Sequence, residues 1–271
     1  MSQNLIFLHI PKAAGSTLRR IIRRQYTDSQ VHVVSSVPDL QQSISQFRSL
    51  PQPERAEIRC LMGHGTYGLH EDLSGSTEYI TMFRHPVSRV ISNYYYVRRS
   101  PEHRLHEEVT KSEMSLHEYV SSGVNAVLDN QMVRDVTGMK SEKPDEKTLR
   151  KAKTNLDDQF GVVGLVERFD ESLLLMKQRY GWNDVSYRKR NVTSSRPRRE
   201  DLPENLIYEI EERNQLDAEL YQYAARALSR ELQQVQLNPS LRLLRFQCWL
   251  RSANAEIRNN AKWVFSVLGL R

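Results

Sequence analysis

The stretch HIPKAAGST occupies residues 9–17 and directly follows the apolar run LIFL at residues 5–8. A short continuous apolar run is typical of a strand buried on both faces of a parallel sheet, and we expect this strand to span Leu5–Ile10. From Ser16 onward the apolar residues recur with helical spacing. The free backbone N–H groups and the dipole at the start of a helix attract anions. The stretch therefore predicts a strand, a phosphate-binding loop and a helix.

The loop differs from the Walker A motif of nucleoside triphosphatases. In that motif the lysine follows a glycine and stands beside the Ser/Thr. Here Lys12 comes at the start of the loop and Gly15 near its end, and Ser16 and Thr17 add hydroxyl donors in the first helical turn. Such a loop can hold a phosphate without an evident Mg²⁺ site. The alternative is an ordinary strand-to-helix turn that carries a surface lysine.

Strands and helices alternate along the chain. Further strands are expected at residues 31–34, 58–62, 78–83 and 160–166, and the intervening helices at residues 38–50, 86–97, 171–180 and 203–232. The alternation predicts a three-layer, P-loop-like α/β fold, with a mainly parallel sheet flanked by helices. Residues 100–158 are helix-rich and contain no strand candidate. We expect one domain at residues 1–235 and a helical C-terminal extension at residues 236–271.

Unusual residues follow three of the expected strands: the loop at residues 9–17, Gly63-His64-Gly65 and Arg84-His85-Pro86. Ligands of open α/β sheets bind outside the carboxyl ends of the strands. The three segments therefore predict one site at this edge of the sheet.

Arg84 and Ser92 predict a second phosphate-binding group. Ser88 and Ser92 lie one turn apart on a helix face away from its apolar stripe. A guanidinium fork together with hydroxyl groups suits a phosphate. The alternative is that Arg84 forms a salt bridge with a carboxylate.

His64 is a candidate general base. The glycines on either side predict a sterically open, exposed imidazole, and the pKa of histidine lies near neutrality. A structural role is the alternative. His103 and His106 form an H-x-x-H pair that signals a metal only weakly, and we favour a solvated helix face for them.

Bulk composition limits the function classes. The chain has 271 residues, of which 39% are hydrophobic and 27% charged, as in a soluble globular protein. Its net charge of +6 suits either an anionic partner or a solvated basic surface. Two cysteines, Cys60 and Cys248, are too few for a disulfide framework.

No apolar run approaches the ~20 residues of a membrane span, and the first strand leaves no room for a signal peptide. We therefore expect a cytoplasmic protein.

Together these motifs resemble those of PAPS-dependent sulfotransferases, where PAPS is 3′-phosphoadenosine-5′-phosphosulfate. The similarity is to the family of the heparan-sulfate 2-O- and related carbohydrate sulfotransferases and their bacterial relatives. HIPKAAGST resembles the family's 5′-phosphosulfate loop, and residues 84–96 resemble its 3′-phosphate motif. Residues 63–65, 164–172 and 191–193 match further. The resemblance covers residues 5–225.

The resemblance implies a role for each matching residue. Lys12 would contact the 5′-phosphosulfate and stabilise the leaving phosphate, and His64 would be the catalytic base. Arg84 and Ser92 would bind the 3′-phosphate. The residues that would cradle the phosphosulfate are Ala14, Gly15, Ser16 and Thr17. A basic segment including Ser194, Arg196 and Arg198 would close over the cofactor.

The chain departs from the family pattern in three places. Position 85 is His where Asp or Asn is usual, which puts the local hydrogen bonding of the motif in question, and position 13 is Ala where Thr is common. The N-terminal membrane anchor of the Golgi members is missing, so we expect a bacterial, cytoplasmic enzyme.

The resemblance implies transfer of a sulfuryl group from PAPS to a hydroxyl acceptor, expected to be a carbohydrate, with PAP (3′-phosphoadenosine 5′-phosphate) as product and without a metal. Two other functions remain open. One is a P-loop-like nucleotide or small-molecule kinase. The other is a basic nucleic-acid-binding protein that stacks bases on the tyrosines at 94–96. The acceptor surface is expected within residues 98–158, and the acceptor's identity and the oligomeric state stay open.

Overall fold

The computed structural model describes residues 3–35, 39–125, 128–139, 143–188, 197–235 and 237–267, with side chains as far as residue 253. The described residues form one five-stranded parallel sheet with the strand order β2-β3-β1-β4-β5. Its strands are β1 (Asn4–Leu8), β2 (Val31–Val34), β3 (Cys60–Gly63), β4 (Thr77–Phe83) and β5 (Phe160–Leu165). β1 lies at the centre, and Leu8 pairs with Gly63 of β3 and Thr81 of β4.

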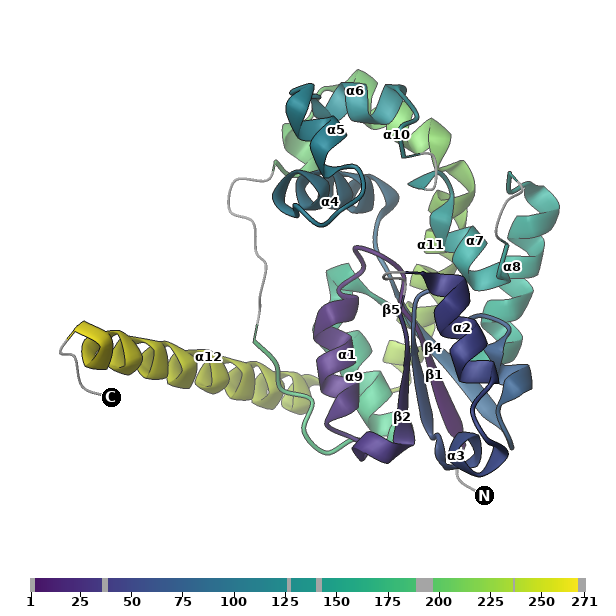
Figure 1. Ribbon diagram of the computed structural model, residues 1–271, viewed down its shortest axis with the longest axis vertical. Coiled ribbons are helices and arrows are strands. Elements are labelled where there is room, and N and C mark those ends of the chain that lie inside the picture. The colour runs from purple at the N-terminus through teal and green to yellow at the C-terminus, as the bar shows by residue number, and fades with distance from the viewer. Residues whose placement is uncertain are drawn as a thin grey trace.

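Helices cover both faces of the sheet, which confirms the predicted three-layer α/β class (Figure 1). On one side lie α1 (Gly15–Arg23) and α9 (Phe169–Tyr180). On the other lie α2 (Leu40–Arg48), α7 (Gln131–Thr137) and α8 (Glu146–Gln159), while α3 (Gln52–Glu57) connects α2 to β3. The long helix α11 (Gln215–Gln233) contacts β5, α7 and α8.

A second group of helices stands above the carboxyl ends of the strands (Figure 1). Its central member, α4 (Pro86–Arg99), starts three residues after β4 and contacts α5 (His106–Lys111), α6 (Leu116–Ser121) and α10 (Glu204–Arg213). The predicted apolar stripe of α4 is buried in a hydrophobic cluster of its own. The site edge of the sheet is thus covered by helices of the segment in which the acceptor surface was expected.

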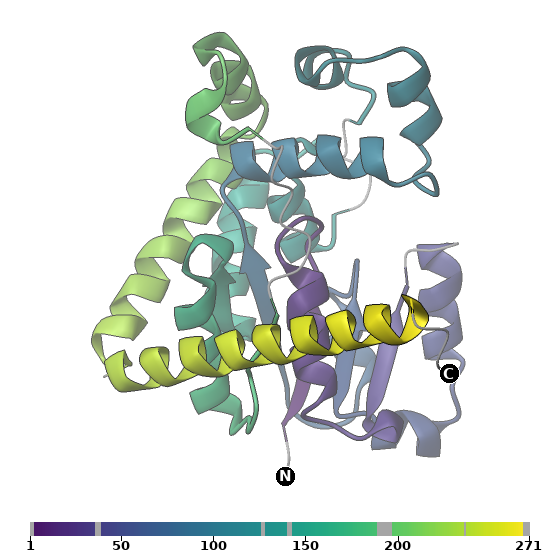
Figure 2. The same cartoon turned by 90° about the vertical axis from the view of Figure 1, so that its left-hand side faces the viewer.

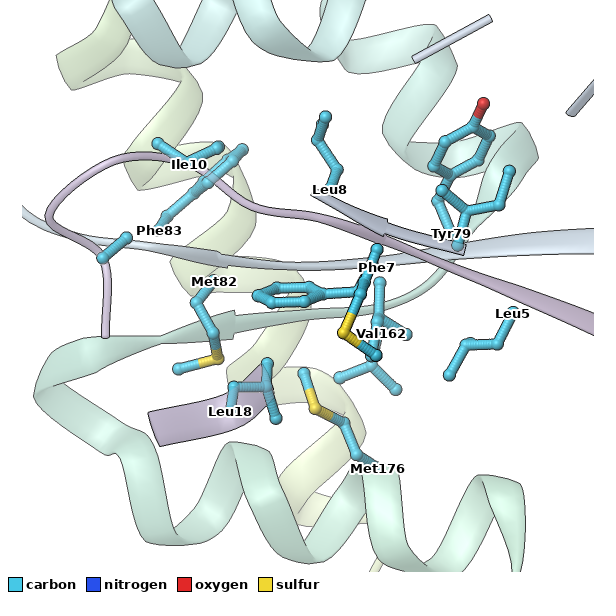
Figure 3. Packing of buried hydrophobic residues seen from close by; sticks show 14 of the residues in the cluster. Leu5, Phe7, Leu8, Ile10, Leu18, Tyr79, Met82, Phe83, Val162 and Met176 are labelled. Atoms are coloured by element: carbon cyan, nitrogen blue, oxygen red, sulfur yellow. The ribbon is translucent and has the colours of Figure 1, made fainter. Parts of the chain in front are cut away.

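The apolar run that opens the chain is buried as predicted, since every residue of β1 is buried. On the side of α1 and α9 the core is built from Phe7, Leu18, Met82, Val162 and Met176 (Figure 3). Burial of such side chains contributes about 1.5–3 kcal/mol each. The central strand, and with it the loop that follows, is therefore firmly placed.

Several element boundaries differ from expectation by one to three residues, among them the end of β1, and larger differences occur before β3 and in the expected helix at residues 203–232. β1 ends at Leu8, two residues earlier than expected. The last hydrogen bond to β3 is the one from the His9 N–H to the Gly63 carbonyl (2.8 Å), and Ile10 already belongs to the loop. α3 was not predicted, because Pro51 and Pro53 were interpreted only as helix stops, whereas proline also suits the first turn of a helix. The helical stretch expected at residues 203–232 is divided at Asn214 into α10 and α11.

The C-terminal helix α12 (Asn238–Val267) confirms the predicted helical extension as far as the structure describes it. Along the described ranges, no helix has the combination of length and apolar character that crossing a bilayer requires.

Candidate active site

The loop between β1 and α1 has the backbone shape of an anion cradle. Lys12 (φ 65°) and Ala14 (φ 57°) adopt left-handed conformations that non-glycine residues rarely adopt. Ala14 immediately precedes α1, and its carbonyl accepts the N–H groups of Thr17 (3.0 Å) and Leu18 (3.2 Å). The first turn of α1 contains no acidic residue. The predicted cradle residues therefore lie in one turn at the positive end of a helix; they are Ala14, Gly15, Ser16 and Thr17.

His9 explains why position 15 is glycine. A Cβ atom at Gly15 would lie 1.8 Å from Cδ2 of His9, well inside van der Waals contact. The His9 ring also stacks on the ring of His64, with 4.2 Å between centroids. The first histidine of the loop thus joins the phosphate loop to the candidate base. Sequence reasoning assigned it no role.

The structure corrects the expectation of an open, exposed His64. Its side chain is half-buried against His9, and its Nδ1 is buried with no hydrogen-bond partner among the described residues. The flanking glycines serve the backbone instead. A Cβ at Gly63 would lie 2.0 Å from the Val34 carbonyl oxygen, and Gly65 has a φ of 59°. The imidazole is held in one orientation, which suits a positioned base better than a free one.

Burial lowers the pKa of His64, and the positive charge of Arg19 lowers it further, against a backbone hydrogen bond with His9 that raises it. Burial, followed by repulsion from a protonated His64 and from the positive charges of Arg19 and Lys12, lowers the pKa of His9 to about 2. Both rings are therefore neutral at pH 7. A neutral imidazole is the form that can accept a proton from a hydroxyl group.

The buried neutral His9 predicts an acid-sensitive fold. Its pKa is about 2 in the folded chain and near 6.5 when unfolded, so its contribution to stability is complete above pH 6.5 and declines as the pH falls below it. Between pH 7.5 and pH 5 the loss is at most about 2 kcal/mol of unfolding free energy. We expect His9→Phe, which keeps a ring in the stack, to reduce this pH dependence in urea unfolding. Equal pH dependence in His9→Phe and the parent would contradict the assignment.

Arg84 joins the two predicted phosphate motifs. It follows β4 directly, and its Nη1 donates to the Lys12 carbonyl oxygen at 3.2 Å. The guanidinium therefore lies against the loop at residues 9–17. The structure brings Lys12 and Arg84 together at the carboxyl edge of the sheet, as the order of the motifs predicted.

The opposite wall of the site is the face of α4 that carries Ser88, Ser92 and Tyr96, spaced four residues apart. Ser92 is half-buried and Tyr96 is 38% exposed. Nζ of Lys12 lies 3.8 Å from the centre of the Tyr96 ring, a cation–π contact. Ser92 stands one turn before Tyr96 on this face, so the predicted serine faces the same side of α4 as the lysine of the loop.

The tyrosine run at 94–96 is not an open stacking platform. Tyr94 is buried and Tyr95 half-buried, while Tyr96 lies under Lys12. This removes the main support for the nucleic-acid-binding alternative.

Glu167 binds the backbone of the unusual residue at position 85. His85 is the N-cap of α4 and makes no capping hydrogen bond with its side chain. Its backbone N–H instead donates to Oε1 of Glu167 (3.1 Å), whose Oε2 accepts the hydroxyl of Tyr221 (3.1 Å). The carboxylate of Glu167, two residues after β5, therefore holds the backbone of position 85 next to Arg84.

The H-x-x-H pair serves local structure. Both histidines are half-buried rather than on the solvated face we favoured. Nδ1 of His103 accepts the Leu105 N–H (3.2 Å), and Nδ1 of His106 lies 2.9 Å from the Val97 carbonyl oxygen. Within the described ranges, no group of three or more His, Cys, Asp or Glu side chains is arranged to hold a metal ion.

Ser194 and Arg196 lie outside the described residues. Arg198, from the same basic segment, is described: its backbone N–H donates to Asp201 (2.7 Å) at the start of a short 3₁₀ turn.

Arg89, which sequence reasoning missed, anchors the wall of the site. Its side chain is fully buried and pairs with the equally buried Asp217 of α11 at 3.2 Å. It also donates to Gln131 (2.8 Å), the Leu128 carbonyl (2.6 Å) and Asn214 (3.2 Å). Periodicity contained no signal for it, because it lies beside the apolar stripe of α4. It ties α4 to α7 and α11 and so fixes the helix that presents Ser92.

Comparison with known proteins shows that this chain is similar to sulfotransferases. The sequence model described as Galactose-3-O-sulfotransferase matches residues 1–261. Galactose-3-O-sulfotransferase 3 of Mus musculus and of Homo sapiens are each 25% identical over 237 residues, 80% of this chain and 54% of the relative. The Bos taurus protein of the same name is 26% identical over 213 residues, 74% of this chain and 45% of the relative. The chain thus spans about half the length of these curated relatives.

Among solved structures, mouse sulfotransferase SULT7A1 complexed with PAP is similar to 78% of this chain and 64% of its own, with 11% identity and a TM-score of 0.42.

Proposed function

This chain belongs to the galactose-3-O-sulfotransferase family, and from that premise we propose that it transfers a sulfuryl group from PAPS to a carbohydrate hydroxyl group. The observation that carries the proposal is the hydrogen bond from Arg84 to the Lys12 carbonyl. It places the two motifs expected to bind the two ends of one nucleotide against each other.

The residues of the site suit a doubly anionic nucleotide. The start of α1, with its uncapped N–H groups and no acidic side chain, offers one anion site, to which Lys12 adds a positive charge. Arg84 and Ser92 offer a second. The lysine and the helix dipole supply positive charge without a metal ion, so the proposal requires none.

In the proposed mechanism, His64 accepts the proton of the acceptor hydroxyl as its oxygen attacks sulfur in line. PAPS, when bound, supplies the sulfuryl group and takes the electrons of the broken S–O bond onto its 5′-phosphate. Lys12 and the N-terminus of α1 stabilise the charge that develops there. Arg84 and Ser92 hold the 3′-phosphate and keep the donor in line with the attacking oxygen.

The acceptor proposed first is the 3-hydroxyl of a terminal galactose, after the name of the family. Sulfate transfer from radiolabelled PAPS to a panel of galactosides and other glycans tests this. We expect label on a terminal galactoside and none on its 3-deoxy analogue. Label on other sugars only would reject the acceptor and keep the donor; no label on any sugar, with no binding of PAP, would reject the proposed function.

Arg84→Ala tests the 3′-phosphate site. Losing a charged hydrogen-bond donor costs about 1.5–3 kcal/mol, so the Kd for PAP should rise roughly 10- to 150-fold in calorimetric titration. Affinity for 5′-AMP, which has no 3′-phosphate, should change much less. Arg20→Ala, an exposed arginine on α1, is the matched control. An unchanged Kd for PAP in Arg84→Ala would remove this residue from the site.

Several sequence-based expectations stay predictions: the domain boundary between residues 235 and 236, the roles of Ser194 and Arg196, and the cytoplasmic setting. The relatives named above are mammalian and give the expected bacterial source no support.

A further inference from the structure

Helix α12 is attached to the body of the protein along one face. It crosses the outside of the α1 and α9 layer and extends past it (Figures 1 and 2). Leu244 is buried against the core, and Leu241 and Cys248 pack beside it. Nε of Arg245 lies 3.3 Å from Asp170, and Nε of Arg251 donates to the Ser186 hydroxyl at 2.6 Å. These contacts fix which side of the helix faces the body.

The opposite face of α12 is apolar and exposed. Leu243, Phe246 and Trp249 are 57%, 54% and 62% exposed, and Leu250 is 38% exposed. The rings of Phe246 and Trp249 stack on each other, with 6.0 Å between centroids. Among the described side chains, four of the six large apolar ones that are exposed belong to this helix. An exposed apolar patch of this kind marks an interaction surface.

The spacing of the exposed stripe is that of a coiled coil. Leu243, Phe246 and Leu250 are spaced three and four residues apart, as at positions a, d and a of a heptad. The sequence continues the pattern for two further heptads, with the next positions occupied by Ala253, Ile257, Asn260, Val264 and Val267. Trp249 stands at the neighbouring g position and widens this stripe next to the a/d seam.

We propose that α12 is a dimerisation helix, which pairs with α12 of a second copy of this chain in antiparallel orientation about a two-fold axis. In the register centred near Cys248, Phe246 of each copy lies opposite Leu250 of the other, and Leu243 opposite Ala253. Asn260 then falls beyond the paired region, because the residue opposite would precede the helix. The seam is apolar throughout the overlap.

Charge complementarity favours this partner and this register. Arg242 and Glu256 both occupy g positions, seven residues before and after Trp249. In an antiparallel pair, g positions face g positions, so Arg242 of each copy meets Glu256 of the other. The pattern is self-complementary under a two-fold axis, as an interface between identical chains requires. Arg245 and Arg251, which bond to the body, lie outside the seam.

Sedimentation velocity of the full chain over a range of concentrations tests the proposal. We expect a species of twice 31.7 kDa. Phe246→Ser should raise the dimer dissociation constant at least tenfold, with the thermal unfolding midpoint of the monomer unchanged because the side chain is exposed there. Tyr208→Ser on α10, which removes another exposed aromatic side chain, is the matched control.

Charge exchange tests the orientation. Arg242→Glu and Glu256→Arg should each weaken the dimer severalfold, because each places like charges opposite one another, and the double variant should restore it.

A monomer at all concentrations would overturn the proposal, as would a dimer that Phe246→Ser leaves intact. Binding to anionic vesicles by a chain that stays monomeric would assign the stripe to a lipid surface instead. A double variant no tighter than the single ones would reject the antiparallel pairing. PAP binding is measured separately, so these results are independent of the proposed function.

Discussion

His64→Gln is expected to lower kcat for sulfate transfer about 10²- to 10⁴-fold, the usual contribution of a general base, and to leave PAP affinity unchanged. The reason is positional. The His9 stack holds the imidazole beside the phosphate loop, and burial lowers its pKa so that it stays neutral at pH 7. Glutamine fills similar space but cannot accept the proton.

The pH profile provides a second measurement of the same role. A base with a lowered pKa is active in its neutral form, so kcat should be level above pH 6.5 and decline only at lower pH. His70→Gln is the control, since His70 lies on the segment after β3 but contacts the Tyr79 hydroxyl (2.8 Å). Full activity of His64→Gln would show that another group removes the proton.

Arg89→Met is expected to destabilise the protein by about 3–5 kcal/mol, the cost of breaking a buried ion pair by removing one partner. Both side chains of the Arg89–Asp217 pair are fully buried, and methionine leaves the Asp217 charge uncompensated. Three acceptors on other elements also lose their donor. Urea unfolding at pH 7 measures the loss.

A neutral partner separates charge from packing. Adding Asp217→Asn to Arg89→Met removes the buried charge and keeps an oxygen for one of the two N–H groups, those of Met132 and Val133, that bond to separate oxygens of Asp217. The double variant should therefore be more stable than Arg89→Met alone. If the two substitutions destabilise additively instead, the pair is not coupled and Arg89 does not anchor α4 through its charge.

The sheet could be predicted because a short local run of apolar residues marks each of its main strands. β1 contains a continuous buried apolar run, β4 and β5 consist mostly of apolar residues, and the β2 bounds agree with the expected range. Parallel strands bring their carboxyl ends to one edge, so three motifs far apart in sequence could be expected at one site. The ends of helices near prolines were harder to predict, because a proline can end one helix and begin the next, as at α3.

The missing parts of the site depend on contacts between distant segments. Nothing in the spacing of residues 9–17 shows that His9 stacks on His64, or that Tyr96 lies under Lys12. The hydrogen bond from the His85 N–H to Glu167 likewise joins residues 82 positions apart. Motifs locate the groups that carry the chemistry; the packing that orients them is visible only in the fold.

Calorimetric titration of the chain with PAP, 5′-AMP and ATP, each with Mg²⁺ and with EDTA, tests whether the loop at residues 9–17 and Arg84 form one metal-independent site for a nucleotide with a 3′-phosphate. We predict that PAP binds at least tenfold more tightly than 5′-AMP or ATP, because only PAP engages Arg84 through a 3′-phosphate, and that EDTA leaves its Kd unchanged. Tighter, Mg²⁺-dependent binding of ATP would contradict this site and favour the nucleotide or small-molecule kinase.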